Sequence, residues 1–174
     1  ATLGFFRQNG APGKTGGTAP GLFEMRTMNS QSHPFWQVTD LSRLSPDQWE
    51  SLCDGCAKCC LQKLEDEETG EIHYTNVACH LLDRATCRCS DYPRRSHRVP
   101  TCISLTPATL RDAYWLPATC AYRLVVEGKP LPAWHPLLTE QADSVIRAGQ
   151  SACGRIISEA EAGDLEHHLV DWVE

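Results

Sequence analysis

Residues 53–60 are the stretch of the chain richest in cysteine, with the sequence Cys53-Asp54-Gly55-Cys56-Ala57-Lys58-Cys59-Cys60. Thiolate is a soft, strongly donating ligand, and four thiolates suit Zn²⁺ or the irons of an iron–sulfur cluster. A Cys-x-x-Cys turn lets two sulfurs reach one centre without bending the chain badly. That step occurs twice here, from Cys53 to Cys56 and from Cys56 to Cys59. The spacing therefore predicts cysteines that ligate a metal.

The adjacent pair Cys59-Cys60 adds a constraint on the number of centres. Neighbouring side chains diverge by about 100° on a helix and point to opposite faces of a strand. The two thiols therefore do not easily share one small ion. They can serve two nearby centres, or one of them can serve a larger cluster.

Five further cysteines follow within the next 60 residues, and together with the first four they make nine candidate ligands. The candidates are Cys53, Cys56, Cys59, Cys60, Cys79, Cys87, Cys89, Cys102 and Cys120. Nine thiols are enough for two four-sulfur sites with one left over, so we expect two centres, although the spacing leaves the pairing open. His73, His80 and His97 are candidate substitutes for a cysteine, but each is also explained as a surface or core histidine. Cys153 stands apart from the set.

Disulfide bonds are the alternative explanation for ten cysteines. The first 27 residues hold no apolar stretch of the length that a secretory signal needs. Thiols as closely spaced as those of residues 53–60 also do not suit disulfide geometry. We therefore expect reduced, metal-ligating cysteines and a cytoplasmic location.

Composition excludes several other classes of protein. The longest aliphatic run is Leu124-Val125-Val126, far short of a membrane-spanning helix. A hydrophobic content of 41% with five Trp argues against a disordered chain. The net charge of −6 argues against general nucleic-acid binding. Five arginines lie between Cys79 and Cys102, and we expect them to offset thiolate charge; the alternatives are a solvated basic loop or a nucleic-acid contact. They are Arg84, Arg88, Arg94, Arg95 and Arg98.

The N-terminal end of the chain differs in composition from the rest. Residues 1–27 contain six Gly and one acid, so we expect a flexible tail. Met25 and Met28 are both plausible starts, which makes the tail a candidate non-native extension. The Gly-rich segment 10–15 lacks the spacing and the preceding strand of a phosphate-binding loop. Residues 28–174 are expected to form a single metal-binding domain.

The expected fold is a small, irregular α+β domain with several short helices and a β-hairpin. A helix begins at Ser45-Pro46 and carries its apolar face, sulfur included, toward Cys60, with a weak point at Gly55. Residues 61–66 and 71–77 flank an acidic turn and predict the hairpin. Residues 79–100 are rich in turn residues and are expected to be irregular. Further helices are expected from Thr106-Pro107, over 120–127, from a cap at Thr139 to Gly149, and over 165–173.

Longer segments around these cysteines resemble a known family. They are WESLCDGCAKCCLQKLEDEETGEI, VACHLLDRATCRCSDY, VPTCISLTP and WLPATCAYRLVVEG. The chain is similar to the bacterial Cys-x-x-Cys-x-x-Cys-Cys proteins, described as zinc- or iron-chelating domains, and in particular to their YcgN-like branch. The resemblance covers about residues 36–159, carries the nine cysteines and implies a metal centre, but it leaves out Cys153. The longer stretch between Cys89 and Cys102, with Arg98-Val99-Pro100 in place of Arg-Pro, departs from the broader family.

Three functions remain open. The first is an iron–sulfur protein that transfers electrons or senses redox state, favoured by the ferredoxin-like repetition of Cys-x-x-Cys. The second is a structural-zinc module that binds a protein partner through an exposed face. The third is a metal-dependent redox or modifying enzyme, because related cysteine clusters accompany a flagellin lysine N-methylase. Trp134-His135-Pro136 offers one candidate catalytic histidine, with a packed Trp and a surface His as the alternative.

Overall fold

The computed structural model describes residues 3–5, 34–37 and 40–173. Most of the predicted N-terminal tail, the Gly-rich segment 10–15 and both candidate start methionines lie outside these residues. Within the predicted tail, Leu3–Phe5 form strand β1, which pairs antiparallel with β2.

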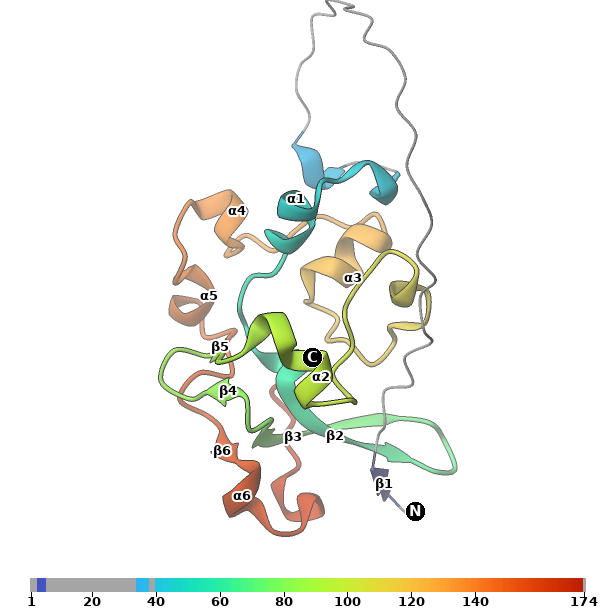
Figure 1. Ribbon diagram of the computed structural model, residues 1–174, viewed down its shortest axis with the longest axis vertical. Helices are drawn as coiled ribbons and strands as arrows, with labels where there is room; N and C mark the ends of the chain where they lie inside the picture. The colour runs from blue at the N-terminus through green and yellow to red at the C-terminus, as the bar shows by residue number, and fades with distance from the viewer. Residues whose placement is uncertain (1–2, 6–33, 38–39, 174) are drawn as a thin grey trace, which may run out of the picture.

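In Figure 1 the four-stranded sheet lies in the lower half of the molecule, most of the short helices lie above it, and the helix at residues 159–162 lies at its lower edge. The strands are β1 (Leu3–Phe5), β2 (Leu61–Asp66), β3 (Ile72–Ala78), β4 (Leu82–Asp83), β5 (Arg88–Cys89) and β6 (Ile157–Ser158). The helices are α1 (Pro46–Glu50), α2 (Arg95–Arg98), α3 (Ala121–Val126), α4 (Pro136–Thr139), α5 (Ser144–Arg147) and α6 (Glu159–Ala162). The 3₁₀ turns are Phe35–Gln37, Leu41–Arg43, Lys58–Cys60, Tyr92–Arg94, Thr109–Asp112 and Leu165–His168. This is the predicted small α+β architecture.

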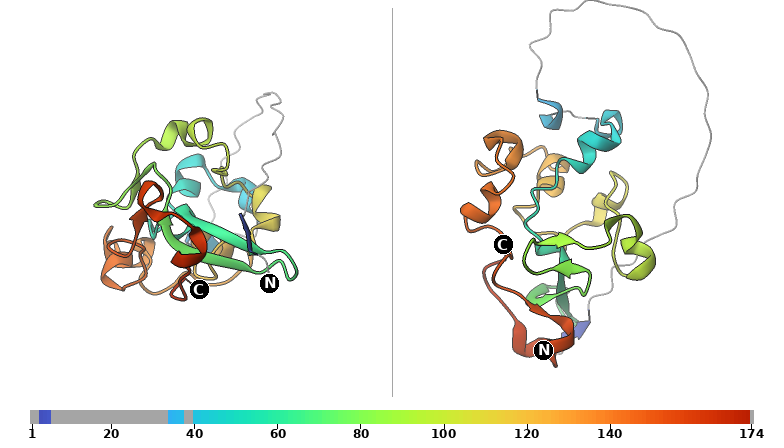
Figure 2. Two further views of the ribbon diagram at one scale, coloured as in Figure 1. Left: turned by 90° about the horizontal axis from the view of Figure 1, so that it is seen from below. Right: turned by 60° about the vertical axis from the view of Figure 1, so that its left-hand side comes forward.

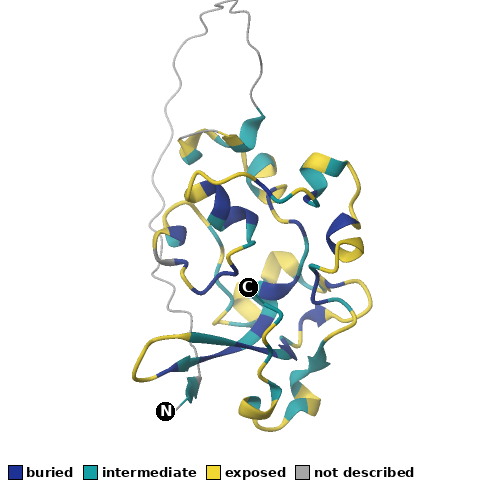
Figure 3. Ribbon diagram, turned by 180° about the vertical axis from the view of Figure 1, so that it is seen from behind, coloured by how far each residue is buried: buried dark blue, intermediate teal, exposed yellow. Residues whose placement is uncertain are grey.

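The β2–β3 hairpin is the centre of the sheet, whose order is β1-β2-β3-β6. β2 pairs antiparallel with β3, and β3 pairs parallel with β6. The acidic turn follows from Asp66, whose Oδ1 accepts hydrogen bonds from the backbone N–H groups of Glu68 and Thr69. The turn is exposed while much of the hairpin behind it is buried (Figure 3). The predicted hairpin is confirmed.

Helix α1 begins as the sequence predicts but ends early. Ser45 forms a capping box with Gln48, and Pro46 occupies the first turn. The helix stops at Glu50, so the prediction that it carries its apolar face on toward Cys60 is wrong. The reason is backbone conformation: Gly55 has φ +76° and Ala57 has φ +62°, which no right-handed helix accommodates. Residues 53–57 form the loop that the weak point at Gly55 had left open as an alternative.

The later helices are shorter than the periodicity suggests. α3 lies inside the predicted range 120–127, and Gly128 follows with φ +66°. The segments after Thr106 and Leu165 form only 3₁₀ turns. The single helix predicted from Thr139 to Gly149 is wrong, because Glu140 adopts φ +57° and separates α4 from α5. None of the described helices is long and apolar enough to cross a membrane.

Two apolar cores lie within the domain. The first core contains Leu52, Leu110, Ala113, Trp115, Leu116, Ala121, Tyr122, Val125 and Leu131. The second core contains Ala57, Leu61, Tyr74, Ala78, Leu82, Cys87 and Ala152. The chain after α5 reaches back to the cysteine loop, since the backbone N–H of Ala152 donates to the carbonyl of Cys56 at 2.8 Å. α4 and α5 lie together at one edge of the molecule (Figure 2).

Candidate metal centre

A cavity of about 240 Å³ lies at the centre of the domain, between the cysteine loop, the start of β2, the segment 79–105 and the start of α3. All nine candidate ligands line it, whereas Cys153 does not: Cys53, Cys56, Cys59, Cys60, Cys79, Cys87, Cys89, Cys102 and Cys120. We call it the thiol cavity. Each of the ten cysteines is free of disulfide bonds. The structure thus brings together the nine thiols that the sequence singles out.

The loop 53–57 turns its cysteines toward this cavity by means of local hydrogen bonds. Asp54 is buried, and its Oδ1 accepts a hydrogen bond from the backbone N–H of Cys56 at 3.0 Å. Gly55 lies against the guanidinium of Arg88, so that a Cβ at this position would stand 2.9 Å from Nη1. A side chain here would displace that guanidinium, and the glycine therefore permits the close approach.

Burial raises the pKa of most thiols in the cavity. Loss of hydration raises the pKa of Cys120 to about 12, although hydrogen bonds from the backbone N–H groups of Arg123 and Tyr122 lower it in part. Cys53 is exposed as a residue, but its thiol lines the cavity and has a pKa raised to about 12 by the same loss of hydration. Desolvation also raises the pKa of Cys56, and the backbone N–H of Lys58 opposes the rise. Thiols of this kind hold their protons near neutral pH until an opposing charge, such as a metal ion, replaces them.

Cys59 differs from its neighbours. Its Sγ lies 3.9 Å from the Sγ of Cys60, and a hydrogen bond from the Cys60 thiol is the main cause that lowers its pKa to about 7. The ammonium of Lys63 lowers the pKa of Cys59 further. Cys59 is therefore the thiol best prepared to act as a thiolate at neutral pH.

Lys63 is a buried cation in the cavity wall that sequence reasoning missed. Its Nζ donates to the carbonyl oxygens of Leu61 at 2.6 Å and Cys59 at 3.0 Å, and it lies 5.1 Å from the centroid of the Tyr74 ring. Among the described residues no carboxylate forms an ion pair with it. Desolvation lowers its pKa to about 8, while the thiolates of Cys59, Cys60 and Cys102 oppose the shift. The sequence signal is the alternation of β2, which puts Lys63 on the same buried face as Leu61.

The five arginines of the segment divide into two groups. Arg88 and Arg95 line the thiol cavity. Arg95 also stacks on Tyr92, with its guanidinium carbon 3.7 Å from the ring centroid, and it lowers the pKa of Cys102 against the rise from desolvation. The other three form ion pairs elsewhere: Arg84 with Glu161, and Arg94 and Arg98 with Asp91. Only two of the five predicted arginines thus face the thiols.

None of the candidate histidines lines the cavity. The Nδ1 of His80 lies 2.6 Å from Glu159 at the surface, and His97 is exposed on α2. His135 is fully buried, with Nε2 3.0 Å from the carbonyl of Leu52, while Nδ1 accepts a hydrogen bond from Leu137. Its contacts are those of a core histidine that fixes the start of α4.

Cys87 has surroundings that the other eight thiols lack. It is buried at φ +52° between β4 and β5 and belongs to the second core, where Cys153 packs against it. The pKa of Cys87 is raised to about 12 by desolvation and by the neighbouring Cys153 thiol. The Sγ of Cys153 in turn lies 3.8 Å from the carbonyl of Ala85. The Cys87 thiol therefore has Cys153 as a neighbour in addition to lining the thiol cavity.

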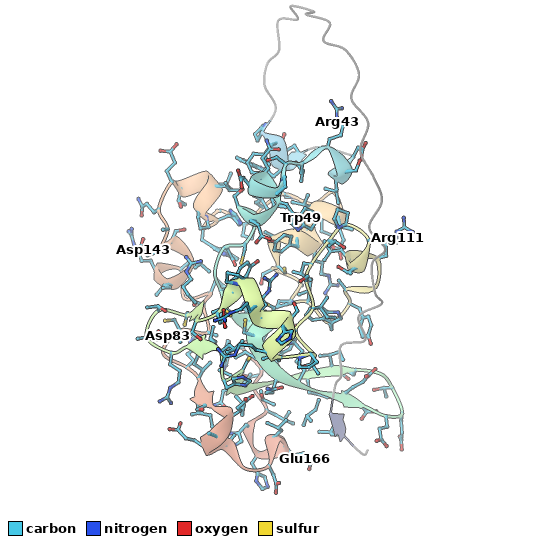
Figure 4. All side chains as sticks on the ribbon, in the orientation of Figure 1. Arg43, Trp49, Asp83, Arg111, Asp143 and Glu166 are labelled. Atoms are coloured by element: carbon cyan, nitrogen blue, oxygen red, sulfur yellow. The ribbon has the colours of Figure 1, made fainter. Side chains whose placement is uncertain are left out.

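The donor set suits a soft metal, although the thiols are not drawn together around a single point. No group of three or more His, Cys, Asp or Glu side chains in the described ranges is already arranged to hold a metal ion. The cavity walls come from segments that are far apart in the sequence. Beside one wall, Trp49 of α1 packs against Tyr122, with ring centroids 5.0 Å apart (Figure 4). Arg43 and Arg111 extend outward in the same view. Ligation of this set requires the thiols to approach one another.

Comparison with known proteins identifies the family. Residues 52–121 match a family model described as "Putative zinc- or iron-chelating domain", named for its Cys-x-x-Cys-x-x-Cys-Cys motif. A UPF0260 protein of Rhizorhabdus wittichii is 61% identical over 138 residues, which cover 79% of this chain and 94% of that protein. The chain belongs to the UPF0260 family. UPF0260 proteins of Parvibaculum lavamentivorans and Cellvibrio japonicus are 55% and 54% identical, covering 83% and 80% of this chain and 96% of each relative.

The matched region begins one residue before Cys53 and ends one residue after Cys120. It therefore contains all nine cysteines of the thiol cavity and leaves out Cys153. No solved structure matches the chain. The narrower assignment to the YcgN-like branch stays a prediction.

Proposed function

We propose that this UPF0260 protein binds metal in the thiol cavity, through the nine cysteines that line it, as two cysteine-ligated centres. The observation that carries the proposal is the convergence of nine thiols from residues 53–120 on one cavity. Three cations, Lys63, Arg88 and Arg95, line the same cavity. Each centre with four thiolates carries net negative charge, which these cations would offset; Lys63 is buried, Arg95 is half-buried and Arg88 is exposed.

Iron–sulfur centres are the form that the cavity supports best. The cavity of about 240 Å³ is much larger than one metal ion requires, since a single water position takes about 10–15 Å³ on the same measure. Iron–sulfur clusters are held by four cysteines each, and their potentials depend on charge and hydrogen bonds around the sulfurs. Such a centre would supply one-electron chemistry. In that role Lys63, Arg88 and Arg95 would stabilise the more negative, reduced state.

The use of such a centre requires a reducing compartment and a partner. Thiolate ligands must stay reduced, which suits the cytoplasm, and the ten free cysteines agree with it. Tyr92 and Arg95 join the cavity wall to the surface, and Tyr92 is exposed. We expect a protein partner that exchanges electrons there.

Structural zinc is the second candidate, favoured by one observation. The cavity walls between Cys79 and Cys120 hold only two-residue strands and short turns or helices, so bound metal could serve mainly to fix the fold. The protein would then present a rigid face to its partner rather than exchange electrons with it.

Metal analysis of anaerobically isolated full-length protein distinguishes these functions. The iron–sulfur proposal predicts brown protein with bound iron and acid-labile sulfide. Colourless protein with stoichiometric zinc would support the structural-zinc candidate instead. Protein without either metal, isolated from cells supplied with both, would contradict metal binding altogether.

A further inference from the structure

Residues 91–99, which include α2, cross one side of the thiol cavity, and we call them the cover segment. Tyr92, Arg95 and Val99 line the cavity at spacings of three and four residues, the spacing that places side chains on one face of a helical segment. The other residues of the segment are exposed, apart from the partly buried Asp91. The cover segment therefore has the cavity on one face and solvent on the other.

The cover segment is tied mainly to itself rather than to the two apolar cores. Neither core contains a described residue of it, whether buried or partly buried. Its ion pairs are internal, since Arg94 and Arg98 pair with Asp91 at 3.0 and 3.1 Å. The Nη1 of Arg95 donates to the carbonyl of Tyr92 at 2.8 Å, and the guanidinium stacks on the Tyr92 ring. The segment can thus move as a unit without breaking these contacts.

A side-chain hydrogen bond joins the cover segment to α1 across the mouth of the cavity. The hydroxyl of Tyr92 donates to the carboxylate of Glu50, the last residue of α1, and both residues are exposed and line the cavity. In the part of the chain that the structure describes, the other side-chain hydrogen bond leaving the segment joins Ser96 to the nearby Ser104. A hydrogen bond from a hydroxyl to a carboxylate is of the stronger, charge-assisted kind. Tyr92 and Glu50 therefore form the main polar contact that holds the segment over the cavity.

Two candidate ligands flank the cover segment. Cys89 lies two residues before it and Cys102 three residues after it, and both line the cavity. Ligation of either thiol would fix the adjoining end of the segment. Bound metal would therefore hold the cover closed, whereas metal that enters or leaves requires it to open.

We propose that the cover segment opens and closes the thiol cavity, and that the hydrogen bond between Tyr92 and Glu50 is the latch that sets how fast metal enters and leaves. The inference rests on the proposed function and assigns that site its route of access. Opening breaks the latch and withdraws Arg95 and Val99 from the cavity, while the ion pairs of Asp91 stay intact. Water then replaces the lost hydrogen bond at both exposed groups.

Transfer of metal from the loaded full chain to the coloured chelator pyridylazoresorcinol measures this opening. Tyr92→Phe removes the latch hydroxyl and is expected to speed release roughly 10-fold, the effect of losing one hydrogen bond to a charged group. Glu50→Ala should speed release by a similar factor. The double variant should release metal no faster than either single variant, because all three lack the same contact.

Tyr114→Phe is the matched control. Tyr114 is exposed and its hydroxyl donates to Glu65 at 3.4 Å, but it does not line the cavity. This variant should release metal at the wild-type rate. An unchanged rate in Tyr92→Phe, a double variant in which the two effects multiply, or equal acceleration in Tyr114→Phe would overturn the latch.

Two further measurements keep the latch testable. Glu50 is exposed at the end of α1, so Glu50→Ala carries the test if Tyr92→Phe fails to fold. Protein isolated without metal would defeat the proposed function, and the latch is then tested by the rate at which dithiobis(nitrobenzoate) reacts with the thiols of that protein. Faster reaction in Tyr92→Phe than in the wild type and Tyr114→Phe supports the latch, and equal rates refute it.

Discussion

The β2–β3 hairpin and the cysteine-bearing segments, residues 53–60 and 79–120, form walls of the same cavity but are held by different interactions. The hairpin has a backbone ladder, a turn fixed by Asp66, and buried residues on both strands. Between Cys79 and Cys120 the strands are two residues long and the helix α2 has four residues. Elements of that length are marginal without tertiary support. The comparison indicates that the thiols, once ligated, replace the backbone pairing that these segments lack.

Removal of the metal should reveal the largest difference in stability between the hairpin and the cysteine-bearing segments. Because ligand binding is coupled to folding in small metal sites, stripping the metal is expected to unfold residues 53–60 and 79–102 while the hairpin keeps its pairing. Near-UV circular dichroism should collapse, since Trp115 lines the cavity. Hydrogen exchange should still protect the amides of β2 and β3. Native near-UV circular dichroism after complete removal of metal would show that packing alone holds the cysteine segments.

Metal affinity should rise with pH, because most of the buried thiols must lose a proton before they bind metal. Cys53 and Cys120, with pKa values raised to about 12, each release a proton on ligation between pH 7 and 9. Each such proton changes the affinity about tenfold per pH unit. The thiolate of Cys59, with its pKa lowered to about 7, is present above that pH and lost as the pH falls through it, so the dependence should steepen below pH 7.

Competition titrations with a chelator of known proton affinity, from pH 6 to 9, measure this dependence. Cys59→Ser should remove the steepening below pH 7, whereas Cys153→Ser should keep it. An affinity that does not change with pH would contradict ligation by buried thiols.

Lys63→Met should weaken metal binding, because it removes the buried cation that faces the ligands. Groups around a metal site that do not ligate it typically change affinity by about 10- to 100-fold, and we expect an effect of that size. Lys58→Met is the matched control. Lys58 is equally buried, and its Nζ lies 3.4 Å from Thr119 and Gln150, but it does not line the cavity. Equal losses in the two variants would show that burial of any lysine matters rather than the charge beside the thiols.

Gly55→Ala should destabilise the cysteine loop by a smaller amount. A non-glycine residue in the left-handed region costs about 1–2 kcal/mol, and here the new Cβ would also displace Arg88 from the cavity. Gly154→Ala is the control for backbone strain alone, since Gly154 has φ +77° and a Cβ there meets nothing within 4 Å. Denaturant unfolding of the loaded protein should show the larger loss for Gly55→Ala, together with weaker metal binding. Identical effects would remove any role for the contact with Arg88.

The structure of the hairpin could be predicted from the sequence, whereas the structure of the cysteine loop could not. The hairpin was predictable because strand patterning and an acidic turn are local signals, and the capping box at Ser45 is local too. The cysteine loop was not, because a spacing of three and four residues suits a helix until Gly55 and Ala57 adopt positive φ. The single helix predicted from Thr139 failed for the same reason at Glu140.

The candidate site was predictable as a set but not in its organisation. Clustering in the sequence and the family resemblance singled out nine cysteines, and these nine line the cavity; that they ligate metal stays a prediction. The sequence did not identify Lys63, because a lysine on a strand is ordinarily exposed, nor the contact between Cys87 and Cys153, which are 66 positions apart in the sequence. Both depend on how β2, β4 and β5 pack, and that packing is not encoded in any one segment.

The most direct test of the account is the content of iron, zinc and acid-labile sulfide per chain in full-length protein isolated without oxygen. We predict bound metal in an amount that Cys56→Ser and Cys79→Ser each lower and that Cys153→Ser leaves unchanged, because Cys56 and Cys79 line the thiol cavity and Cys153 does not. Wild-type protein that folds with native near-UV circular dichroism and binds neither metal would contradict it.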